Sequence, residues 1–462
     1  MKTQLISNPH ADKAFDIGSR LELFVDDYLI DRMSGAALAL HKPTPREVAI
    51  VHDQPWEGNT CGYHTVFRDD NHFKMYHRGS DHDQQAQNSK HEVVCYAESE
   101  DGIHWTKPDL GLVDFNGSKQ NNIVWDGAGS HNFAPFKDTN PNCKADRKYK
   151  ALAGGAGGLH AFKSSDGIRW SLMSDGPVIT KGAFDSQNLA FWDTTRNAYV
   201  DFHRGANTTG NTRVRDIMTC ISADFIHWTE PAWIQYPGAP IEHLYTNQIT
   251  PYYRAPHIFM GFPKRFMPTR HIGEAADKGV SDGVFMTSRD GLRFKRWGEA
   301  FIRSGLQKER WINRNNMTSW GILETASDIP GTPNELSIYS TEGYYGGGSC
   351  RLRRFTLRLD GFVSVQAPLS GGEIVTRSLV FDGSALVINF STSGVGSVQV
   401  EVQNSEGKAI EGFALADSEI YGDEIAHVVI WSGGSDLRSL AGKPIRLRFV
   451  LRDADVYSFR FC

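Results

Sequence analysis

The sequence has no metal-type cysteine motif, no long apolar run and no block of basic residues. Its six cysteines are scattered, and no two form a Cys-x-x-Cys pair. This spacing argues against a zinc site or a disulfide framework and favours free, buried thiols. No apolar run approaches the ~20 residues of a membrane-spanning helix, and residues 1–10 lack the apolar core of a secretory signal. We therefore expect no membrane partner and a cytoplasmic protein, or a secreted or periplasmic one whose signal peptide has been removed.

The charge balance also excludes a class of partner. A net charge of -5 without a basic segment argues against nucleic acid, which proteins bind by neutralising phosphates. At 40% hydrophobic and 22% charged residues, the 462-residue chain has an ordinary globular composition. Its length allows two or three domains.

What the sequence does contain is a repeat. Residues 164–170, Ser-Ser-Asp-Gly-Ile-Arg-Trp, have close copies at 99–105, 222–228 and 288–294 and a degenerate fifth copy at 359–362, with the aspartates spaced by 65, 58, 66 and 70 residues. Asp-Gly between apolar runs is a hairpin-turn signal. A repeat of this period, built from short alternating runs, is typical of a β-propeller. We expect the aromatic residue that ends each of the first four copies to pack between neighbouring blades.

The remaining runs complete an all-β prediction. Between the turns, alternating runs predict four strands per blade, with inner strands near 60–67, 132–136, 187–192, 247–252 and 316–320 and second strands near 72–77, 148–153, 198–203, 257–262 and 336–340. We predict a five-bladed β-propeller over residues 1–365, closed by an N-terminal strand at 21–30. About eight short strands beyond it predict a C-terminal β-sandwich over residues 366–462. No segment has the pattern of an amphipathic helix.

Strand direction predicts where chemistry takes place. In an antiparallel blade all the Asp-Gly turns lie at one end of the ring, so we interpret them as scaffold. The opposite mouth, where inner strands begin and second strands end, is rich in charged residues. Three acids begin inner strands there, namely Glu57, Asp185 and Glu242. Cleavage of a glycosidic bond needs one carboxylic acid and a second carboxylate, so we predict Glu57 as nucleophile or base, Asp185 as orienting acid and Glu242 as general acid.

The same reasoning predicts residues that hold the substrate. These are Arg78, His131, Asn188, Arg204, His243, Asn247, Arg265, Arg314 and Glu342. The arginines allow a carboxylate or sulfate on the substrate, since guanidinium binds such groups bidentately. Ion pairing of each acid with a mouth arginine is the alternative for the acids. Asp26, Asp27, Asp138 and Asp193 are further candidate acids, the last two with a turn role as the alternative.

Three segments carry a resemblance to a known family. Residues 23–30, 352–362 and 454–459 resemble a group of bacterial proteins described as glycosyl hydrolase-like. A propeller followed by a sandwich is similar to the five-bladed glycoside hydrolases of families 32 and 43, and the Asp-Gly turns resemble the Asp-box of sialidases. The Asn-Asp-Pro-Asn-Gly stretch of family 32 is absent, and residues 55–59 stand in its place. The resemblance implies a glycosidase without implying a fructan substrate.

We therefore expect a glycoside hydrolase with a carbohydrate substrate and no required cofactor. A structural metal ion in the propeller channel is compatible with the sequence, with His131 and His243 as possible ligands. The alternatives are a glycan-binding propeller without turnover and a glycoside phosphorylase, which uses one carboxylate and phosphate and which a basic mouth would suit.

Overall fold

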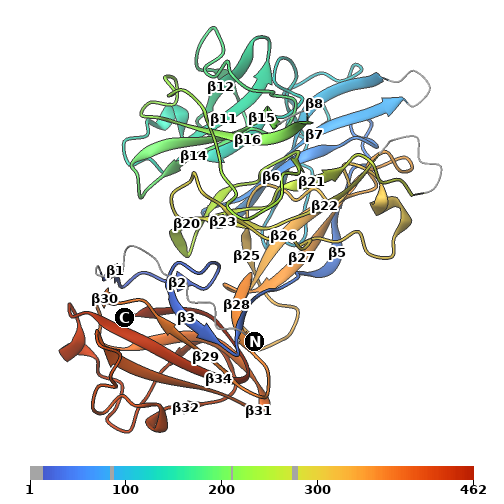
Figure 1. Ribbon diagram of the computed structural model, residues 1–462. Helices are drawn as coiled ribbons and strands as arrows, with labels where there is room; N and C mark the ends of the chain where they lie inside the picture. The colour runs from blue at the N-terminus through green and yellow to red at the C-terminus, as the bar shows by residue number, and fades with distance from the viewer. Residues whose placement is uncertain (1–13, 84–87, 210–211, 273–278) are drawn as a thin grey trace. The chain divides into compact units, whose positions relative to one another are not determined.

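The computed structural model describes residues 14–83, 88–209, 212–272 and 279–462, and they fold almost entirely into β-strands (Figure 1). The helical elements of these residues are four 3₁₀ turns of three or four residues, at Ala145–Arg147, Lys308–Trp311, Leu415–Asp417 and Arg438–Leu440. The predicted all-β class is therefore confirmed. No helix in the described part of the chain has the length and apolar character to cross a membrane.

The contacts divide the chain into a larger unit, Pro43–Thr356, and a smaller one made of Met1–Lys42 and Leu357–Cys462. The larger unit contains five four-stranded sheets, whose strands are hydrogen-bonded in the following orders. Sheet 1 is β6 (Gly62–Asp69), β7 (His72–Asp83), β8 (Asn88–Ser99) and β9 (Ile123–Trp125); sheet 2 is β10 (Ala134–Lys137), β11 (Tyr149–Gly155), β12 (Gly158–Ser164) and β13 (Ser171–Leu172); sheet 3 is β14 (Leu189–Asp193), β15 (Ala198–Thr209), β16 (Thr212–Ser222) and β17 (Ala232–Trp233); sheet 4 is β19 (Thr250–Tyr252), β20 (Ala255–Gly261), β23 (Met286–Ser288) and β24 (Lys295–Arg296); sheet 5 is β25 (Leu323–Thr325), β26 (Glu335–Glu342), β27 (Arg351–Arg358) and β5 (Thr44–Val51). A small sheet of β18 (His243–Leu244), β21 (Lys264–Met267) and β22 (Val280–Gly283) joins them.

Three of the five predicted second strands lie within β7, β15 and β26, and the other two overlap β11 and β20 except for one residue each, Lys148 and Phe262. The predicted inner strand at 316–320 differs, since this segment forms only isolated bridges, Thr318 with Ser340 and Trp320 with Thr65. The first regular strand of sheet 5 is β25, three residues later.

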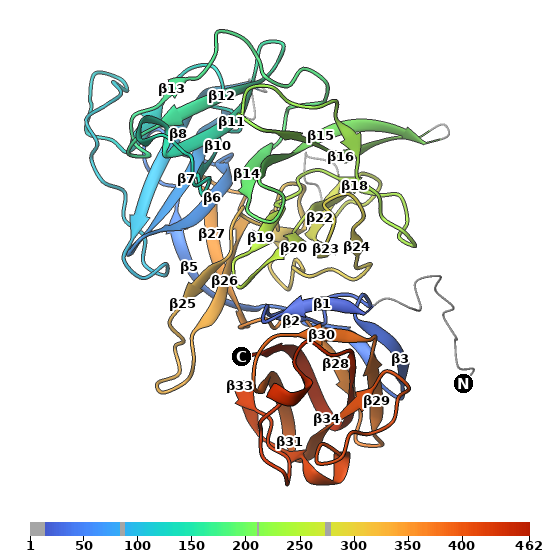
Figure 2. The same ribbon diagram turned by 90° about the vertical axis from the view of Figure 1, so that its left-hand side faces the viewer.

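Successive sheets contact one another, and the fifth contacts the first. Tyr76 of β7 donates a hydrogen bond to the carbonyl oxygen of Gly167 (2.7 Å), in the turn after β12. Tyr339 of β26 makes the same bond to Gly102, in the turn after β8. Sheets 2 and 3, 3 and 4, and 4 and 5 are joined by the pairs Phe136–Phe225 (5.6 Å), Phe202–Phe294 (6.0 Å) and Tyr253–Glu324 (2.6 Å). Figure 2 shows β6, β10 and β14 next to one another, in agreement with their contacts.

The Asp-Gly turns have the scaffold geometry that the repeat indicates. Asp101 Oδ1 accepts the backbone N–H groups of Ile103 and His104 (both 2.8 Å), and Ser99 Oγ accepts that of Gly102 (2.9 Å). The same pattern recurs at 164–169, 222–227 and 288–293. Each of these four aspartates is thus occupied by its own turn, where such bonds fix the backbone. The fifth copy is different, because Asp360 instead accepts from Ser458 Oγ (2.8 Å) in the smaller unit.

The turn aromatics pack between sheets where the repeat predicts it. Trp170, which ends the second copy, lies edge-on to Tyr76 of sheet 1 (6.2 Å) and to Phe133 (4.9 Å). Trp105, which ends the first copy, lies edge-on to Tyr339 of sheet 5 (6.0 Å).

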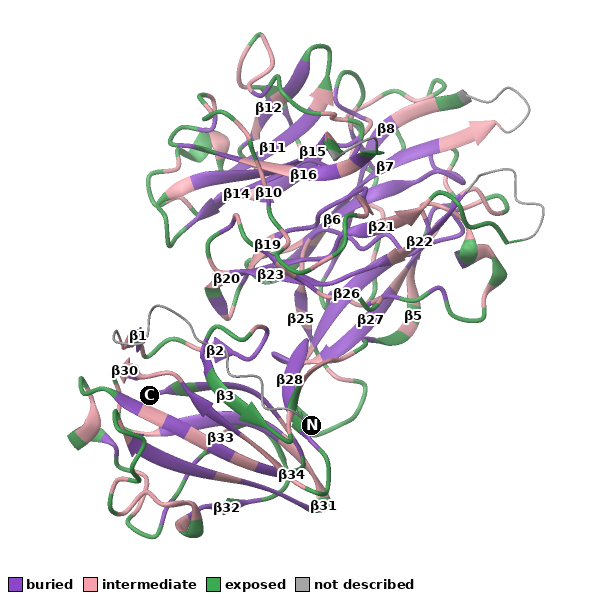
Figure 3. Cartoon of the chain, viewed as in Figure 1, coloured by how far each residue is buried: buried purple, intermediate pink, exposed green. Residues whose placement is uncertain are grey.

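The smaller unit is one hydrogen-bonded network of eleven strands around a single apolar core. Its strands are β1 (Phe15–Gly18), β2 (Glu22–Leu23), β3 (Ile30–Ser34), β4 (Ala37–Leu40), β28 (Val363–Ala367), β29 (Gly372–Thr376), β30 (Leu379–Phe381), β31 (Leu386–Asn404), β32 (Glu419–Ile420), β33 (Asp423–Val428) and β34 (Ile445–Phe461). The two long strands, β31 and β34, pair with each other and bring the others together. Figure 3 shows the alternation of buried and partly buried residues along β34 that an internal apolar face requires.

The predicted ring closure by residues 21–30 is wrong. Leu23 in β2 pairs with Ser458 of β34, and β3 pairs with β29, so this segment belongs to the smaller unit. The physical reason is apolar burial, since Phe24 packs against Phe449 (6.0 Å) and Phe459 (5.5 Å) in that core. The strand added to sheet 5 is β5, which pairs with β27. The division of the chain accordingly differs from the predicted one at residue 365.

Candidate functional site

The three predicted acids lie in three different surroundings. Among the described residues, no hydrogen bond or ion pair connects Glu57, Asp185 and Glu242 with one another. Each acid is therefore considered with its own partners.

Glu57 is a buried member of an ion-pair network. Its side chain has no exposed surface, and its carboxylate lies 2.5 Å from Lys107 Nζ, 2.8 Å from His77 Nε2 and 3.3 Å from His52 Nδ1. Burial raises the pKa of Glu57, but the bonds from His52 and His77 outweigh it and hold the pKa below its usual value. The acid is thus ionised, paired and closed off from a substrate, and its prediction as a mouth nucleophile is not supported by this environment.

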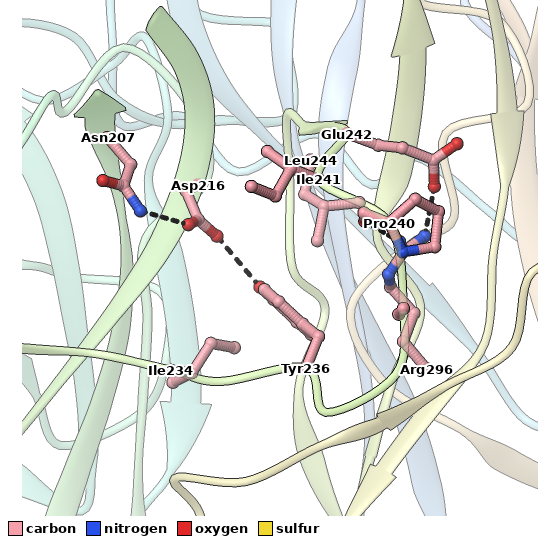
Figure 4. A pocket seen from close by; sticks show the side chains of 10 residues that line it. Asn207, Asp216, Ile234, Tyr236, Pro240, Ile241, Glu242, Leu244 and Arg296 are labelled. Atoms are coloured by element: carbon pink, nitrogen blue, oxygen red, sulfur yellow. Dashed lines mark hydrogen bonds and ion pairs between the residues drawn. The ribbon is translucent and has the colours of Figure 1, made fainter. Parts of the chain in front are cut away.

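Glu242 lines a pocket of about 190 Å³ (Figure 4). Its carboxylate pairs with Arg296 and with Arg265 Nη1 (3.3 Å), while Asp216 across the pocket accepts from Tyr236 (3.1 Å). Figure 4 shows Glu242 and Arg296 on one wall of the pocket and Asp216 on the other, with Ile234 and Leu244 among the apolar lining. The volume lies below the ~300 Å³ at which ligand pockets usually begin.

Asp185 is the predicted acid that remains open to solvent. Its side chain is 70% exposed, and its Oδ1 lies 3.0 Å from Arg204 Nη1 and accepts a hydrogen bond from the Tyr245 hydroxyl (3.2 Å). Burial of part of the group raises its pKa, but the charges of Arg204 and Arg314 lower it below the usual value. Asp185 is therefore an accessible, ionised carboxylate.

Asp185 belongs to a group of tyrosines and cations that we call the tyrosine–arginine cluster. Its members are Tyr63, Arg78, Glu92, His131, Asp185, Arg204, Arg314, Tyr245 and Tyr344. The hydroxyls of Tyr63 and Tyr245 are hydrogen-bonded to each other (2.9 Å), and both also reach the backbone carbonyl of Asp185 (3.4 and 3.1 Å).

Two arginines of the cluster share one hydroxyl. Arg78 Nη2 and Arg314 Nη1 both donate to the Tyr344 oxygen, at 2.6 and 3.1 Å. The guanidinium of Arg78 also stacks over the Tyr63 ring (4.9 Å), and that of Arg204 over the Tyr245 ring (5.1 Å). Such cation–π contacts hold the guanidinium planes in place without neutralising their charge.

Glu92 supplies the second carboxylate of the cluster. Its oxygens lie 2.9 Å from His131 Nδ1 and 3.5 Å from Arg78 Nη1. His131 Nδ1 is also 3.1 Å from Arg78, and since one ring nitrogen either donates or accepts, we assign it as the donor to Glu92, the stronger acceptor. Burial raises the pKa of Glu92, while the His131 bond and the charge of Arg78 bring it below its usual value.

Backbone strain is also found in the cluster. Tyr63 (φ 56°), Arg314 (φ 69°) and the neighbouring Tyr345 (φ 59°) have left-handed backbone conformations. Such conformations are costly for bulky residues and often accompany functional sites.

Four of the nine predicted substrate-binding residues, Arg78, His131, Arg204 and Arg314, therefore lie in the cluster. The amide groups of Asn188 and Asn247 are used by the backbone, in bonds to Ser186 O (2.6 Å) and Phe202 O (3.0 Å). Their prediction as sugar-binding groups conflicts with this use, because neither side chain presents a free amide to a ligand.

The other three predicted contacts lie elsewhere. Glu342 is fully buried among Arg310, Arg351 and Arg353, at 3.4, 3.1 and 2.7 Å, so it neutralises scaffold charges instead of binding sugar. Arg265 is held by Asp282 (2.7 Å) and Glu242 beside the small pocket. His243 Nδ1 accepts the backbone N–H of Arg215 (3.2 Å), and burial followed by the charge of Arg215 lowers its pKa.

Glu92 and the three tyrosines were not predicted from the sequence. Glu92 lies near the start of β8, the strand that leads to the first Asp-Gly turn. Because β7 and β8 are antiparallel, the start of β8 lies at the same end of the sheet as the end of β7. The strand pattern could therefore have identified Glu92, because the starts of third strands lie at the same mouth as the ends of second strands.

Three buried groups have the residue types of a metal site, namely His52, His64 and His77; Glu57, His77 and Cys95; and Asp201, His203 and Cys220. In the first group His52 Nε2 and His64 Nε2 are 2.8 Å apart, the separation of a hydrogen bond. Two imidazole nitrogens on one tetrahedral zinc ion would lie roughly 3.3 Å apart. The histidines thus have the geometry of a hydrogen-bonded relay that ends on Glu57.

No protein-family model and no curated protein sequence matches the chain. Among solved structures it is similar to a protein named glycoside hydrolase (13% identity, 68% of this chain and 92% of that one, TM-score 0.45) and to a glycosyl hydrolase from Bacteroides ovatus (13%, 68% and 94%, TM-score 0.43). It is also similar to a family 32 β-fructofuranosidase from Bombyx mori (10%, 92% and 94%, TM-score 0.40). All three TM-scores are below 0.5, so these similarities carry no inference about function.

Proposed function

We propose that the chain is a glycoside hydrolase and that the tyrosine–arginine cluster is its active site. The observation that supports this most directly is Asp185, an exposed and ionised carboxylate held in place by Arg204 and Tyr245. Hydrolysis of a glycosidic bond needs such a group, either to attack the sugar or to activate water, and a second group to protonate the leaving oxygen.

The proposed fold gives this site its setting. We interpret the five four-stranded sheets as the blades of a five-bladed propeller and the smaller unit as a β-sandwich. The contacts from each sheet to the next, and from sheet 5 back to sheet 1, support a closed ring. Gln187 Nε2 donates to Thr65 Oγ1 (2.9 Å), and Gln248 donates to Gln187 Oε1 (2.6 Å), so β6 and the segments that lead into β14 and β19 meet as inner strands would.

We assign Asp185 as the nucleophile or base and Glu92 as the general acid. Asp185 suits its role because the neighbouring arginines keep it ionised. Glu92 receives its proton through His131, which is 34% exposed and lies 2.9 Å away. In the free protein the hydrogen bond from His131 and the charge of Arg78 both oppose protonation of Glu92, so the acid role requires that they be offset when substrate binds.

These roles replace those predicted from the sequence for Glu57 and Glu242. Glu57 already balances Lys107, and Glu242 already balances Arg265 and Arg296. Protonating or attacking with either acid would leave buried or half-buried cations without a counter-charge, which is costly.

The test is a screen of the wild-type protein against neutral and acidic oligosaccharides and aryl glycosides, with products separated by chromatography. On any substrate that is cleaved, we expect Asp185→Asn and Glu92→Gln to lower kcat at least ~100-fold, the usual scale of acid–base catalysis. Asp109→Asn, an exposed acid of the same unit, serves as the matched control and should leave kcat unchanged. Glu242→Gln separates the two assignments, because it abolishes turnover only if the assignment from sequence is right.

Two outcomes would contradict the proposal. Unchanged kcat in Asp185→Asn would remove the cluster from catalysis. A glycan that binds wild type and the Asp185→Asn/Glu92→Gln double variant alike, without any product, would instead identify a glycan-binding protein.

A further inference from the structure

The tyrosine–arginine cluster contains more positive charge than its acids neutralise. Arg78, Arg204 and Arg314 face two carboxylates, Asp185 and Glu92. One more cation stands at the same rings, since Arg215 lies over the Tyr245 ring at 5.6 Å. The three arginines of the cluster exceed its two acids, which leaves an excess of positive charge at one place in a protein whose net charge is -5.

Arg314 shows this excess most clearly. Its hydrogen bond goes to the neutral Tyr344 hydroxyl, and its other contacts are with the rings of Tyr245, Tyr344 and Tyr345 at 5.5 to 5.7 Å. Within the described ranges, no acid lies within 4.0 Å of its guanidinium. The residue is only partly buried, so a ligand has access to it.

Arg78, which belongs to β7, binds the same tyrosine hydroxyl as Arg314. It is 3% exposed, it donates to the same Tyr344 oxygen, and its Nε is buried without a hydrogen-bond partner among the described residues. Two guanidinium groups that share one neutral acceptor repel each other, and Glu92, 3.5 Å from Arg78, offsets the charge of only one of them. Tyr344 thus fixes a pair of cations whose natural complement is a group with two or three negatively charged oxygens.

We propose that Arg78 and Arg314, with Arg204 and Arg215 at the edge, form an oxyanion subsite of the active site. The proposal rests on the proposed function and specifies its substrate class, a carbohydrate that presents a carboxylate or sulfate group, or a carbohydrate cleaved with phosphate. All three groups fit two converging guanidinium forks, which bind such oxygens bidentately.

The subsite also supplies what the proposed acid lacks. The hydrogen bond from His131 and the charge of Arg78, which lies 3.5 Å away, together hold the pKa of Glu92 below its usual value in the free protein. An anion bound to Arg78 offsets the second of these causes and so raises the pKa of Glu92 toward protonation. Binding of the acidic group and readiness of the general acid are thereby coupled, so a neutral analogue should lose turnover as well as affinity.

The test measures binding of three probes to the full chain at low ionic strength by titration calorimetry. The probes are glucuronate, a sulfated N-acetylglucosamine and inorganic phosphate, with glucose as the neutral reference and chloride as the competing anion. We expect at least one anion to bind at least 10-fold more tightly than chloride. The tightest probe distinguishes a carboxylated, a sulfated or a phosphate-dependent substrate, and phosphate-dependent cleavage in the glycoside screen would confirm the third.

Variants of Arg314 localise the effect. We expect Arg314→Met to weaken the bound anion at least 10-fold and Arg314→Lys to keep part of the affinity, because lysine retains the charge without the fork. Arg303→Met, at an exposed arginine of the same unit, is the matched control and should leave affinity unchanged. A thermal melt of each variant verifies folding, and Arg204→Met serves in the same way if Arg314→Met does not fold.

The outcomes separate this inference from the proposed function. The subsite is overturned if no anion binds more tightly than chloride, or if wild type and Arg314→Met bind the anion with equal affinity. This holds even if a neutral glycoside is cleaved. Anion binding that depends on Arg314, with no glycoside cleaved in the screen, upholds the subsite and overturns the hydrolase.

Discussion

The substitution Glu57→Gln distinguishes a structural acid from a catalytic one. The carboxylate is wholly buried and is bonded to Lys107, His77, His52 and the backbone N–H of Gln54. An amide of the same shape removes the negative charge and leaves the Lys107 ammonium without its closest counter-charge. Breaking a buried ion pair by neutralising one partner costs about 3–5 kcal/mol.

The cost at this position should lie below that range. Lys107 is 14% exposed, and its Nζ also reaches Val51 O (2.6 Å) and Asp53 Oδ1 (3.3 Å), which soften the loss. We therefore expect the free energy of unfolding to fall by about 2–3 kcal/mol. For a unit of this size, roughly 2 °C per kcal/mol converts this into a Tm lower by about 4–6 °C.

The assay is thermal unfolding by calorimetry together with kcat on a cleaved substrate, measured well below Tm. The variant should be less stable but active within a few-fold of wild type. Asp185→Asn is the matched comparison, because that acid is 70% exposed and should change stability by no more than ~0.5 kcal/mol while losing turnover. An unchanged Tm with a 100-fold loss of kcat in Glu57→Gln would refute this reasoning and restore the catalytic role predicted from the sequence.

Three further predictions concern stability and binding. Burial lowers the pKa of His77 to about 4. Below pH ~6.5 this histidine is therefore protonated in the unfolded chain but not in the folded one, so the free energy of unfolding should fall by about 3 kcal/mol between pH 6.5 and 4. Urea denaturation at a series of pH values measures this change. Asp166→Ala removes the acceptor of two turn N–H groups and should cost about 1–2 kcal/mol in the same assay with kcat unchanged, and a loss of turnover would give the turns a catalytic role. Tyr344→Phe removes the hydroxyl that orients Arg78 and Arg314 and should raise KM at least several-fold, whereas an unchanged KM would show that the arginines need no such support.

The repeating part of the structure could be predicted from the sequence because its determinants are local. In the turn at 164–169, Asp166 and Ser164 bond the N–H groups of the next few residues, so a seven-residue pattern is enough to identify each turn. The spacing of four such turns then defines the sheets. The position of the N-terminal segment was predicted wrongly, because it depends on the packing of Phe24 against Phe449 and Phe459, more than 400 residues away in the chain.

The site was predicted less well because the strand pattern gives the position of a residue along its strand but not the cavity into which its side chain points. Tyr245 reaches Asp185, whereas Glu242 and Leu244 on the same segment face the small pocket. Successive side chains of an extended segment alternate between faces, so Glu242 and Leu244 share one face and Tyr245 lies on the other. Glu57 differs for another reason, since its partner Lys107 comes from a loop fifty residues away that the repeat does not describe.

The pairing of β4 with β28 has a consequence for how the protein is assembled. Leu40 lies opposite Val363 and Leu38 opposite Val365, so two residues that flank the whole of the larger unit are neighbours in one antiparallel ladder. In topological terms the larger unit is an insertion into a β-hairpin of the smaller one. The inserted unit is continuous in sequence and is synthesised completely before its host has received β34, the strand that organises the host core. During translation the larger unit is therefore complete while the smaller unit still lacks its last strand. To produce the smaller unit alone, the natural design is a short turn between Leu40 and Val363 in place of residues 41–362.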